Sequence, residues 1–180
     1  SVLYHLTKLG WKDVMLVERS DLTSGSTWHA AGGFHTLNGD TNMAALQGYT
    51  IRLYKELEAI TGMSCGLHHV GGVTLADNVA RFEMLKAERA KHRYMGLDTE
   101  ILGPEEIYKL TDGMVNLEGI IGGLYDPLDG HLDPSGTTHA YAKAARMGGA
   151  EIVLHNRVLE TNPTPEGWEV VTEKGTVQLS

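Results

Sequence analysis

Apolar residues recur at helical spacing at the start of the chain and then give way to a short, continuous apolar run. Residues 2–9 carry valine and leucine at this spacing, and Gly10 ends the pattern. Residues 13–18, "DVMLVE", are typical of a buried strand that ends in an acid. A helix followed by such a strand is the second half of a βαβ unit. We therefore expect the first strand of that unit, with its glycine-rich turn, to lie before Ser1.

The remaining pattern predicts a mixture of helices and strands. Helices are expected at 42–61, 77–94, from Pro104 onward and at 137–147. In the second of these, Asp77 is the expected N-cap and Gly96 ends the helix. Strands are expected at 71–76, 119–127, 151–161 and 167–180, the last with a turn at 173–175. After a loop at 19–40 the two kinds of element no longer alternate regularly. The predicted fold is α/β. Residues 1–40 form the first part of a Rossmann-like domain that lacks its first strand and its G-x-G-x-x-G fingerprint. Residues 41–130 form a mixed α+β insertion on the substrate side. Residues 131–180 return to the Rossmann-like domain and leave it incomplete.

Composition narrows the classes of function. The chain has 180 residues and a net charge of −8, which argues against a general nucleic-acid-binding protein because such a protein needs a basic face. Cys65 is the only cysteine, so no internal disulfide can form and a reducing compartment is expected. No apolar run approaches the roughly 18 residues of a membrane span. The first residues do not look like a signal peptide.

Glu18 and residues 24–33, "SGSTWHAAGG", carry the groups that the sequence offers to a nucleotide cofactor. An acid at this strand end accepts hydrogen bonds from the ribose of adenosine, although an ordinary solvent-exposed carboxylate also fits. Residues 24–27 supply hydroxyl and N–H groups for an anion such as a pyrophosphate, or only for a helix N-cap. Residues 30–33 are small enough for a flat ring to approach the backbone. His29 is either a nucleophile or a ring bonded to a loop carbonyl.

Metal and hydrolase chemistry find little support. Cys65, His68 and His69 form a loose group, but no second pair follows at zinc-ligand spacing. The aspartates of residues 126–133 depart from the spacing of a calcium loop, so a turn is expected there. No serine lies in a G-x-S-x-G sequence. We therefore expect neither a metal site nor a serine hydrolase.

Three segments together resemble the dimethylglycine dehydrogenase and sarcosine dehydrogenase family of glycine-oxidase-like (D-amino-acid oxidase) flavoproteins. They are residues 1–33, which contain "STWHAAGG", residues 122–134, "GGLYDPLDGHLDP", and residues 157–175, "RVLETNPTPEGWEVVTEKG". The likeness covers nearly the whole chain, and "STWHAAG" is its most specific part. It implies a fragment cut at both ends, with most catalytic, substrate-binding and folate-binding residues of the family outside it.

The resemblance assigns individual residues to FAD. Glu18 matches the glutamate that holds the adenosine ribose, with Arg19 beside it, and Val158 matches a valine whose backbone contacts the adenine. His29 matches the histidine that is covalently bonded to the 8α-methyl carbon of FAD. The loop that wraps the flavin matches Gly25, Ser26, Thr27, Trp28, Ala30, Ala31, Gly32 and Gly33.

The activity implied by the resemblance is oxidation of the N-methyl C–N bond of a glycine-like secondary or tertiary amine, such as dimethylglycine or sarcosine. Hydride passes to covalent FAD and an iminium forms. The implied electron acceptor is oxygen or an electron-transfer flavoprotein, and tetrahydrofolate takes part only in a longer protein. The implied compartment is the cytoplasm in a bacterium or the mitochondrial matrix in a eukaryote. The isolated 180 residues are expected to be inactive.

Three alternatives remain beside this interpretation. One is a relative that binds FAD non-covalently and oxidises a different amino acid, and another is a non-catalytic regulatory paralogue, such as the regulatory subunit of pyruvate dehydrogenase phosphatase. His29 argues against both. The third is an NAD-binding domain, but no feature of the sequence supports a nicotinamide site. Residues 32–40, "GGFHTLNGD", depart from the family pattern, so the exact amine is left open.

Overall fold

The computed structural model describes residues 1–36 and 38–179. Leu37 and Ser180, which the sequence analysis assigns to a loop and to the last strand, lie outside the described residues. The chain forms two compact units, each built from separated stretches. Unit 1 comprises residues 1–31, 56–66 and 133–180, and unit 2 comprises residues 32–55 and 67–132. The functional division at 1–40, 41–130 and 131–180 stays a prediction.

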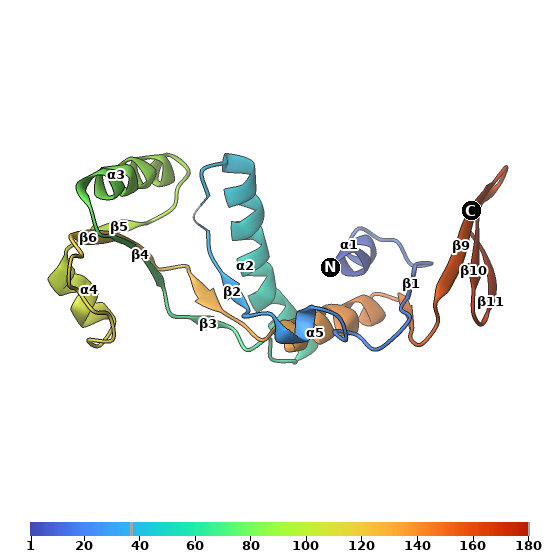
Figure 1. The fold of residues 1–180 in the computed structure, drawn as a ribbon. Helices are drawn as coiled ribbons and strands as arrows, with labels where there is room; N and C mark the ends of the chain where they lie inside the picture. Colours follow the sequence, from blue (N-terminus) through green and yellow to red (C-terminus); the bar gives the residue numbers. More distant parts are fainter. Residues whose placement is uncertain (37, 180) are drawn as a thin grey trace. The chain divides into compact units, whose positions relative to one another are not determined.

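Unit 1 is organised around two parallel strands (Figure 1). Its elements are α1 (Val2–Lys8), β1 (Met15–Val17), the 3-10 turn η1 (Thr27–His29), α5 (Pro134–Met147), β8 (Glu151–Val153), β9 (Val158–Thr164), β10 (Gly167–Thr172) and β11 (Gly175–Leu179). β1 pairs with β8 from Met15↔Glu151 to Val17↔Val153. The last three strands form an antiparallel sheet in the order β11-β10-β9. Strands so far apart in the chain that pair in parallel, with helices beside them, fit the predicted Rossmann-like part.

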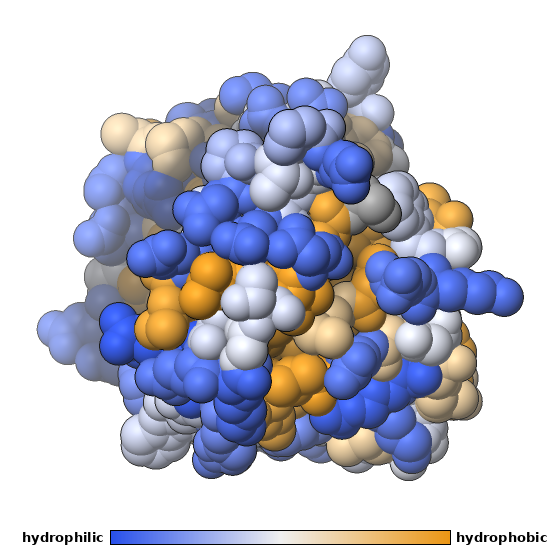
Figure 2. Space-filling model, turned by 90° about the vertical axis from the view of Figure 1, so that its right-hand side faces the viewer, coloured by the Kyte–Doolittle hydropathy of each residue, from blue (hydrophilic) through white to orange (hydrophobic). Residues whose placement is uncertain are grey.

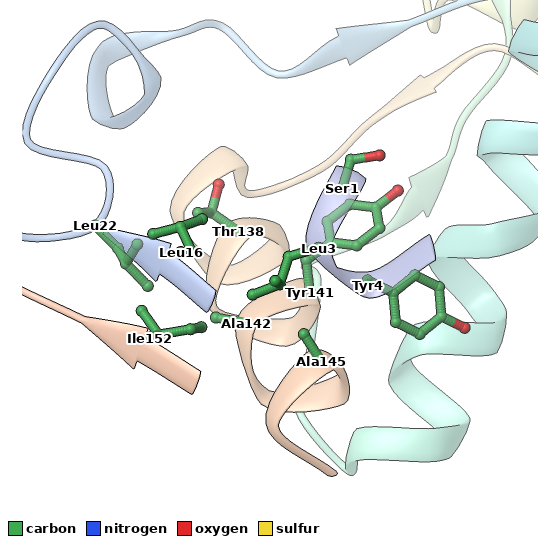
Figure 3. Close-up of a pocket in the computed structure, with 10 residues that line it drawn as sticks. All are labelled: Ser1, Leu3, Tyr4, Leu16, Leu22, Thr138, Tyr141, Ala142, Ala145 and Ile152. Carbon is green, nitrogen blue, oxygen red and sulfur yellow. The ribbon is translucent and has the colours of Figure 1, made fainter. Parts of the chain in front are cut away.

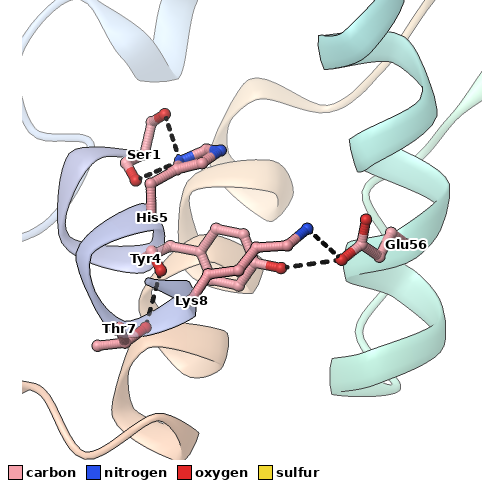
Figure 4. Close-up of polar contacts among 6 residues, drawn as sticks. All are labelled: Ser1, Tyr4, His5, Thr7, Lys8 and Glu56. Carbon is pink, nitrogen blue, oxygen red and sulfur yellow. Dashed lines mark hydrogen bonds and ion pairs between the residues drawn. The ribbon is translucent and has the colours of Figure 1, made fainter. Parts of the chain in front are cut away.

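Helices α1 and α5 pack against each other because each presents a compact buried face. α5 buries mainly small side chains, so another helix can approach it closely: Thr137, Ala140, Ala142, Ala144 and Ala145. α1 contributes buried Leu3 and Tyr4. Figure 4 shows that Tyr4 and Lys8 both reach Glu56, at 3.2 and 2.6 Å, which ties α1 to the unit 1 end of α2 (Thr41–Thr61).

Unit 2 contains two three-stranded antiparallel sheets. Besides the first part of α2, its elements are β2 (Gly33–Phe34), β3 (His68–His69), β4 (Gly72–Ala76), α3 (Val79–Tyr94), β5 (Glu100–Leu102), α4 (Pro104–Leu110), β6 (Gly122–Asp126) and β7 (Gly130–His131). The strand orders are β2-β7-β3 and β4-β6-β5. Ala76, Leu85 and Leu124 form a fully buried cluster, against which Phe82 and Ile101 pack. This cluster joins α3 to the second sheet.

Two predicted helix starts are wrong, and the reason is the geometry of the caps. Asn78, not Asp77, caps α3, because its backbone is extended and its side chain accepts a hydrogen bond from the N–H of Arg81 at 2.8 Å. α5 begins at Pro134 rather than at residue 137. The Asp133 side chain caps it through the N–H of Ser135, and Pro134 fits the first turn, where no N–H is needed. The predicted turn near residue 173 and the start of α4 at Pro104 are confirmed.

The surface mixes apolar and polar residues. Figure 2 shows orange apolar patches interrupted by blue polar groups on one face. The exposed large apolar residues of unit 1 include all three tryptophans, Trp11, Trp28 and Trp168. None of the described helices combines the length and the apolar character that crossing a lipid bilayer requires.

Candidate functional site

Glu18 lies directly after β1, and its backbone is hydrogen-bonded to β8 and to the segment that follows β8. Its N–H donates to the carbonyl of Val153 at 2.8 Å, and its own carbonyl accepts from the N–H of Asn156 at 2.9 Å. One carboxylate oxygen accepts from the N–H of Ser20 at 2.9 Å, and no donor among the described residues reaches the other oxygen. The half-buried carboxylate is thus held in place with one acceptor atom available. A ribose hydroxyl is a suitable donor for that atom.

Val158 and Arg19 occupy the same corner of unit 1. Val158 begins β9 two residues after Asn156, which is hydrogen-bonded to Glu18, and its side chain is exposed. Arg19 follows Glu18 and is also exposed. The chain therefore brings Glu18, Arg19 and the start of β9 to the carboxyl ends of the parallel strands. Ligands of α/β sheets bind at such strand ends.

Residues 24–31 form open turns around η1. Ser26 precedes η1 with a helical backbone and makes no side-chain capping bond, so the predicted N-cap does not form. Ser24, Gly25 and Ser26 are exposed, and Thr27 is half-buried. η1 itself is in contact with α5. An anion-binding role of Gly25, Ser26 and Thr27 stays a prediction.

His29 is exposed and has no hydrogen-bond or ion partner among the residues that the structure describes. The alternative of a ring bonded to a loop carbonyl is therefore not what the described structure shows. Its ring contacts that of Trp28, with 4.8 Å between the ring centroids and an interplanar angle of 80°. Ala30 and Ala31 beside it are exposed as well. The imidazole is accessible to a ligand.

At two glycines of this stretch, a methyl side chain would not clash with the rest of the described protein. A Cβ built at Gly25, in unit 1, or at Gly33, in unit 2, meets no atom within 4 Å. Other glycines of the chain do face atoms: a Cβ at Gly130 would lie 2.1 Å from the carbonyl oxygen of His68. Within unit 1, the open space beside Gly25, an accessible imidazole and a fixed carboxylate with a free oxygen are features that fit a flavin dinucleotide.

Two segments that carry the resemblance, the glycines that end "STWHAAGG" and the segment "DGHL", are joined in unit 2. β2 pairs with β7, with Gly33 opposite His131 and Phe34 opposite Gly130. The N–H of Leu132 donates to the carbonyl of Gly32 at 3.0 Å. β2 and β7 both lie inside predicted loops, so their pairing was missed because two-residue strands leave no periodic signal. The end of "STWHAAGG" is therefore hydrogen-bonded to "DGHL".

A carboxyl pair beside this sheet was also missed from the sequence. Asp126 is 1% exposed, and its carboxylate accepts hydrogen bonds from the Thr36 hydroxyl at 2.5 Å and from the N–H of Leu128 at 2.9 Å. The second of these bonds makes the predicted turn. Burial, a hydrogen bond with Asp126 and the negative charge of Asp126 raise the pKa of Asp129 to about 7. At neutral pH and below, one proton is therefore shared within the pair.

We expect Asp129→Asn to alter how stability depends on pH. Folded Asp129 keeps its proton up to about pH 7, whereas the ordinary pKa is 3.8. Unfolding therefore releases a proton in this window, and the stability contributed by the group is lost as the pH rises through about 7. The amide of the variant donates to Asp126 at every pH. Between about pH 5 and 8 the melting temperature of the wild type should fall relative to that of the variant.

Asp98→Asn, at an exposed position of the same unit, is the matched control. His92 also titrates in unit 2: it is 3% exposed, and burial lowers its pKa, so its effect is a loss of stability as the pH falls. Wild type and variant both contain His92, so both should lose stability at low pH, apart from the difference between them near pH 7. Parallel pH profiles of wild type and Asp129→Asn would contradict the shared proton.

The residues weighed as metal ligands do not form a metal-binding group. Among the described residues, no three or more histidine, cysteine, aspartate or glutamate side chains are placed to hold a metal ion. His68 and His131 are cross-strand neighbours whose rings lie 4.9 Å apart. Cys65 is fully buried, and burial raises the pKa of its thiol, so it is an unreactive structural residue.

A small cavity of about 100 Å³ in unit 1 does not coincide with these groups. Figure 3 shows the side chains that line it between α1, β1, β8 and α5, with Leu16, Leu22 and Ile152 pointing toward its centre. The lining is mainly aliphatic and does not include Glu18 or His29. It is unsuited to the charged phosphates of a dinucleotide.

Comparison with known proteins identifies the family of the chain. The model of the FAD-dependent oxidoreductase family, DAO, matches residues 1–179. Mouse mitochondrial dimethylglycine dehydrogenase is 38% identical over 100% of this chain, and human mitochondrial sarcosine dehydrogenase is 37% identical over 84% of it. The chain covers 21% and 16% of these proteins, about a fifth or less of their length.

A solved structure shares the fold. L-proline dehydrogenase from P. horikoshii superimposes with a TM-score of 0.89 and 22% identity, over 98% of this chain and 46% of that one. The α/β fold predicted from the sequence is confirmed, and so is the resemblance to the dimethylglycine and sarcosine dehydrogenases. The chain belongs to the DAO family of FAD-dependent oxidoreductases.

Proposed function

We propose that the protein containing this chain oxidises the N-methyl C–N bond of a glycine-like secondary or tertiary amine, such as dimethylglycine or sarcosine. We further propose that its FAD is attached covalently through His29. The observation that carries the proposal is the exposed His29 imidazole, without a hydrogen-bond partner in the described part of the chain, in a sequence 38% identical to a dimethylglycine dehydrogenase.

The residues of the chain have distinct roles in this proposal. Bound FAD supplies the acceptor for the hydride of the amine. Glu18 would accept a hydrogen bond from a ribose hydroxyl with the carboxylate oxygen that Ser20 does not contact. The backbone of Val158 would contact the adenine. Residues 25–33 give the flavin its clearance, and His29 supplies the nitrogen of the covalent link. The substrate loses a hydride from its N-methyl carbon and becomes an iminium, whose one-carbon unit passes to water or tetrahydrofolate with release of the demethylated amine.

The test is anaerobic mixing of the full-length protein with candidate amines, followed by the flavin absorbance. Sarcosine or dimethylglycine should bleach the flavin, because each nitrogen has a lone pair that can form an iminium. Glycine betaine is the matched control, since its quaternary nitrogen has no lone pair and cannot form one. Absence of bleaching by every secondary and tertiary N-methyl amine would overturn the proposed substrate class.

The same full-length protein also distinguishes the proposed function from a non-covalent FAD relative and from a regulatory paralogue. A relative with non-covalent FAD would be bleached by an amino acid and would lose its flavin on acid precipitation, whereas a regulatory paralogue would not be bleached. Reoxidation in air, compared with reoxidation by an electron-transfer flavoprotein, tests the two proposed electron acceptors. The proposed compartment is the mitochondrial matrix in a eukaryote and the cytoplasm in a bacterium.

A further inference from the structure

Trp28 makes an unusual contact for an exposed side chain. It is 64% exposed, yet its ring meets the His29 imidazole at 80° with the centroids 4.8 Å apart. This is the edge-to-face arrangement that aromatic pairs prefer. Both residues lie on η1, a turn of three residues in contact with α5, so the backbone that carries the pair is anchored within unit 1.

No hydrogen bond or ion pair within the described residues fixes the orientation of the His29 ring. Neither ring nitrogen has a hydrogen-bond partner in the described part of the chain. The following residues, Ala30 and Ala31, carry only methyl groups and are exposed. The ring contact with Trp28 restricts rotation of the imidazole about its side-chain bonds. An exposed imidazole without such a contact would sample several rotamers.

We propose that Trp28 is a positioning residue: it holds the His29 imidazole in the orientation in which a ring nitrogen can bond to FAD. This inference rests on the proposed covalent link. In that step the His29 nitrogen bonds to the 8α-methyl carbon, and the carbon and the imidazole each give up a proton. The electron pair of the broken C–H bond stays on the flavin, which dioxygen reoxidises with formation of hydrogen peroxide. Orientation matters because a misaligned nucleophile reacts more slowly.

The test uses the full-length protein prepared without flavin, to which FAD is added in air. Acid-stable flavin is followed over time, and total bound flavin is measured separately by gel filtration. Trp28→Leu should bind FAD but attach it roughly tenfold more slowly, since the edge contact is lost. Trp28→Phe, which keeps an aromatic ring, should restore most of the rate. Because the position is exposed, neither change removes a buried side chain.

Trp11→Leu is the matched control, because Trp11 is 62% exposed, lies in unit 1 and is outside η1. It should attach flavin at the wild-type rate. Attachment by Trp28→Leu at the wild-type rate, in a protein whose wild type is covalently flavinylated, would overturn the positioning role alone. Absence of acid-stable flavin in the wild type would instead overturn the covalent link, and the role of Trp28 with it.

Discussion

His29→Ala should release all of the flavin when the full-length protein is precipitated with acid, whereas the wild type should stay yellow. The reason is chemical: alanine has no nitrogen to bond to the 8α-methyl carbon, so the cofactor is held by non-covalent contacts alone. Acid unfolds the protein and abolishes those contacts. The measurement is the ratio of flavin in the pellet to flavin in the supernatant.

His35→Ala is the control for this experiment. His35 is an exposed histidine six residues further along the chain. Its loss should leave the flavin in the pellet. Free flavin from the precipitated wild type, or a yellow pellet from His29→Ala, would refute attachment at His29. The non-covalent contacts should persist in His29→Ala, so the native variant is expected to bind FAD reversibly.

Leu124→Ala should destabilise unit 2 by about 2–5 kcal/mol. Leu124 is fully buried on β6, the central strand of β4-β6-β5, where it packs with Ala76 and Leu85. Alanine removes the apolar contacts and leaves a cavity that a close-packed cluster cannot readily close. Native-state hydrogen exchange of the β4, β5 and β6 amides in the full-length protein measures this loss.

Leu128→Ala provides the comparison, because Leu128 lies just beyond the same strand but is 43% exposed. It should cost well under about 1 kcal/mol, since an exposed side chain gains little from burial. Its backbone N–H still donates to Asp126 in the variant. Equal losses of protection in the two variants would show that the cluster around Leu124 is not the core of unit 2.

Local signals in the sequence predicted the helices well and the short strands poorly. Residues 42–61 carry a long periodic pattern, and the structure has a helix at Thr41–Thr61. Pro104 marks the start of α4, and Pro134 carries the same signal at the start of α5. β2 and β7 have two residues each and exist only because of their partners far along the chain. Such pairing has no local signature.

In the candidate site, the sequence identified individual residues but not the contacts between them. Glu18 was recognisable as an acid at the end of a strand. Its tie to Asn156, which brings the start of β9 beside it, depends on the parallel pairing of β1 with β8. His29 and Trp28 were identified through the resemblance. Their ring contact depends on the conformation of η1, for which the sequence offered only a helix N-cap that does not form.

Unit 1 is built from stretches that lie far apart in the sequence, and this affects how the protein folds during synthesis. On the ribosome, β1 is complete once Val17 has been added, but its partner β8 follows only at Glu151–Val153. Closing so long a loop is slow and entropically costly. In unit 2, β4, β5 and β6 all lie within residues 72–126 and pair with one another, so this sheet can form before β8 has been synthesised. Until β8 emerges, the nascent chain exposes an apolar strand edge, the kind of surface that chaperones bind.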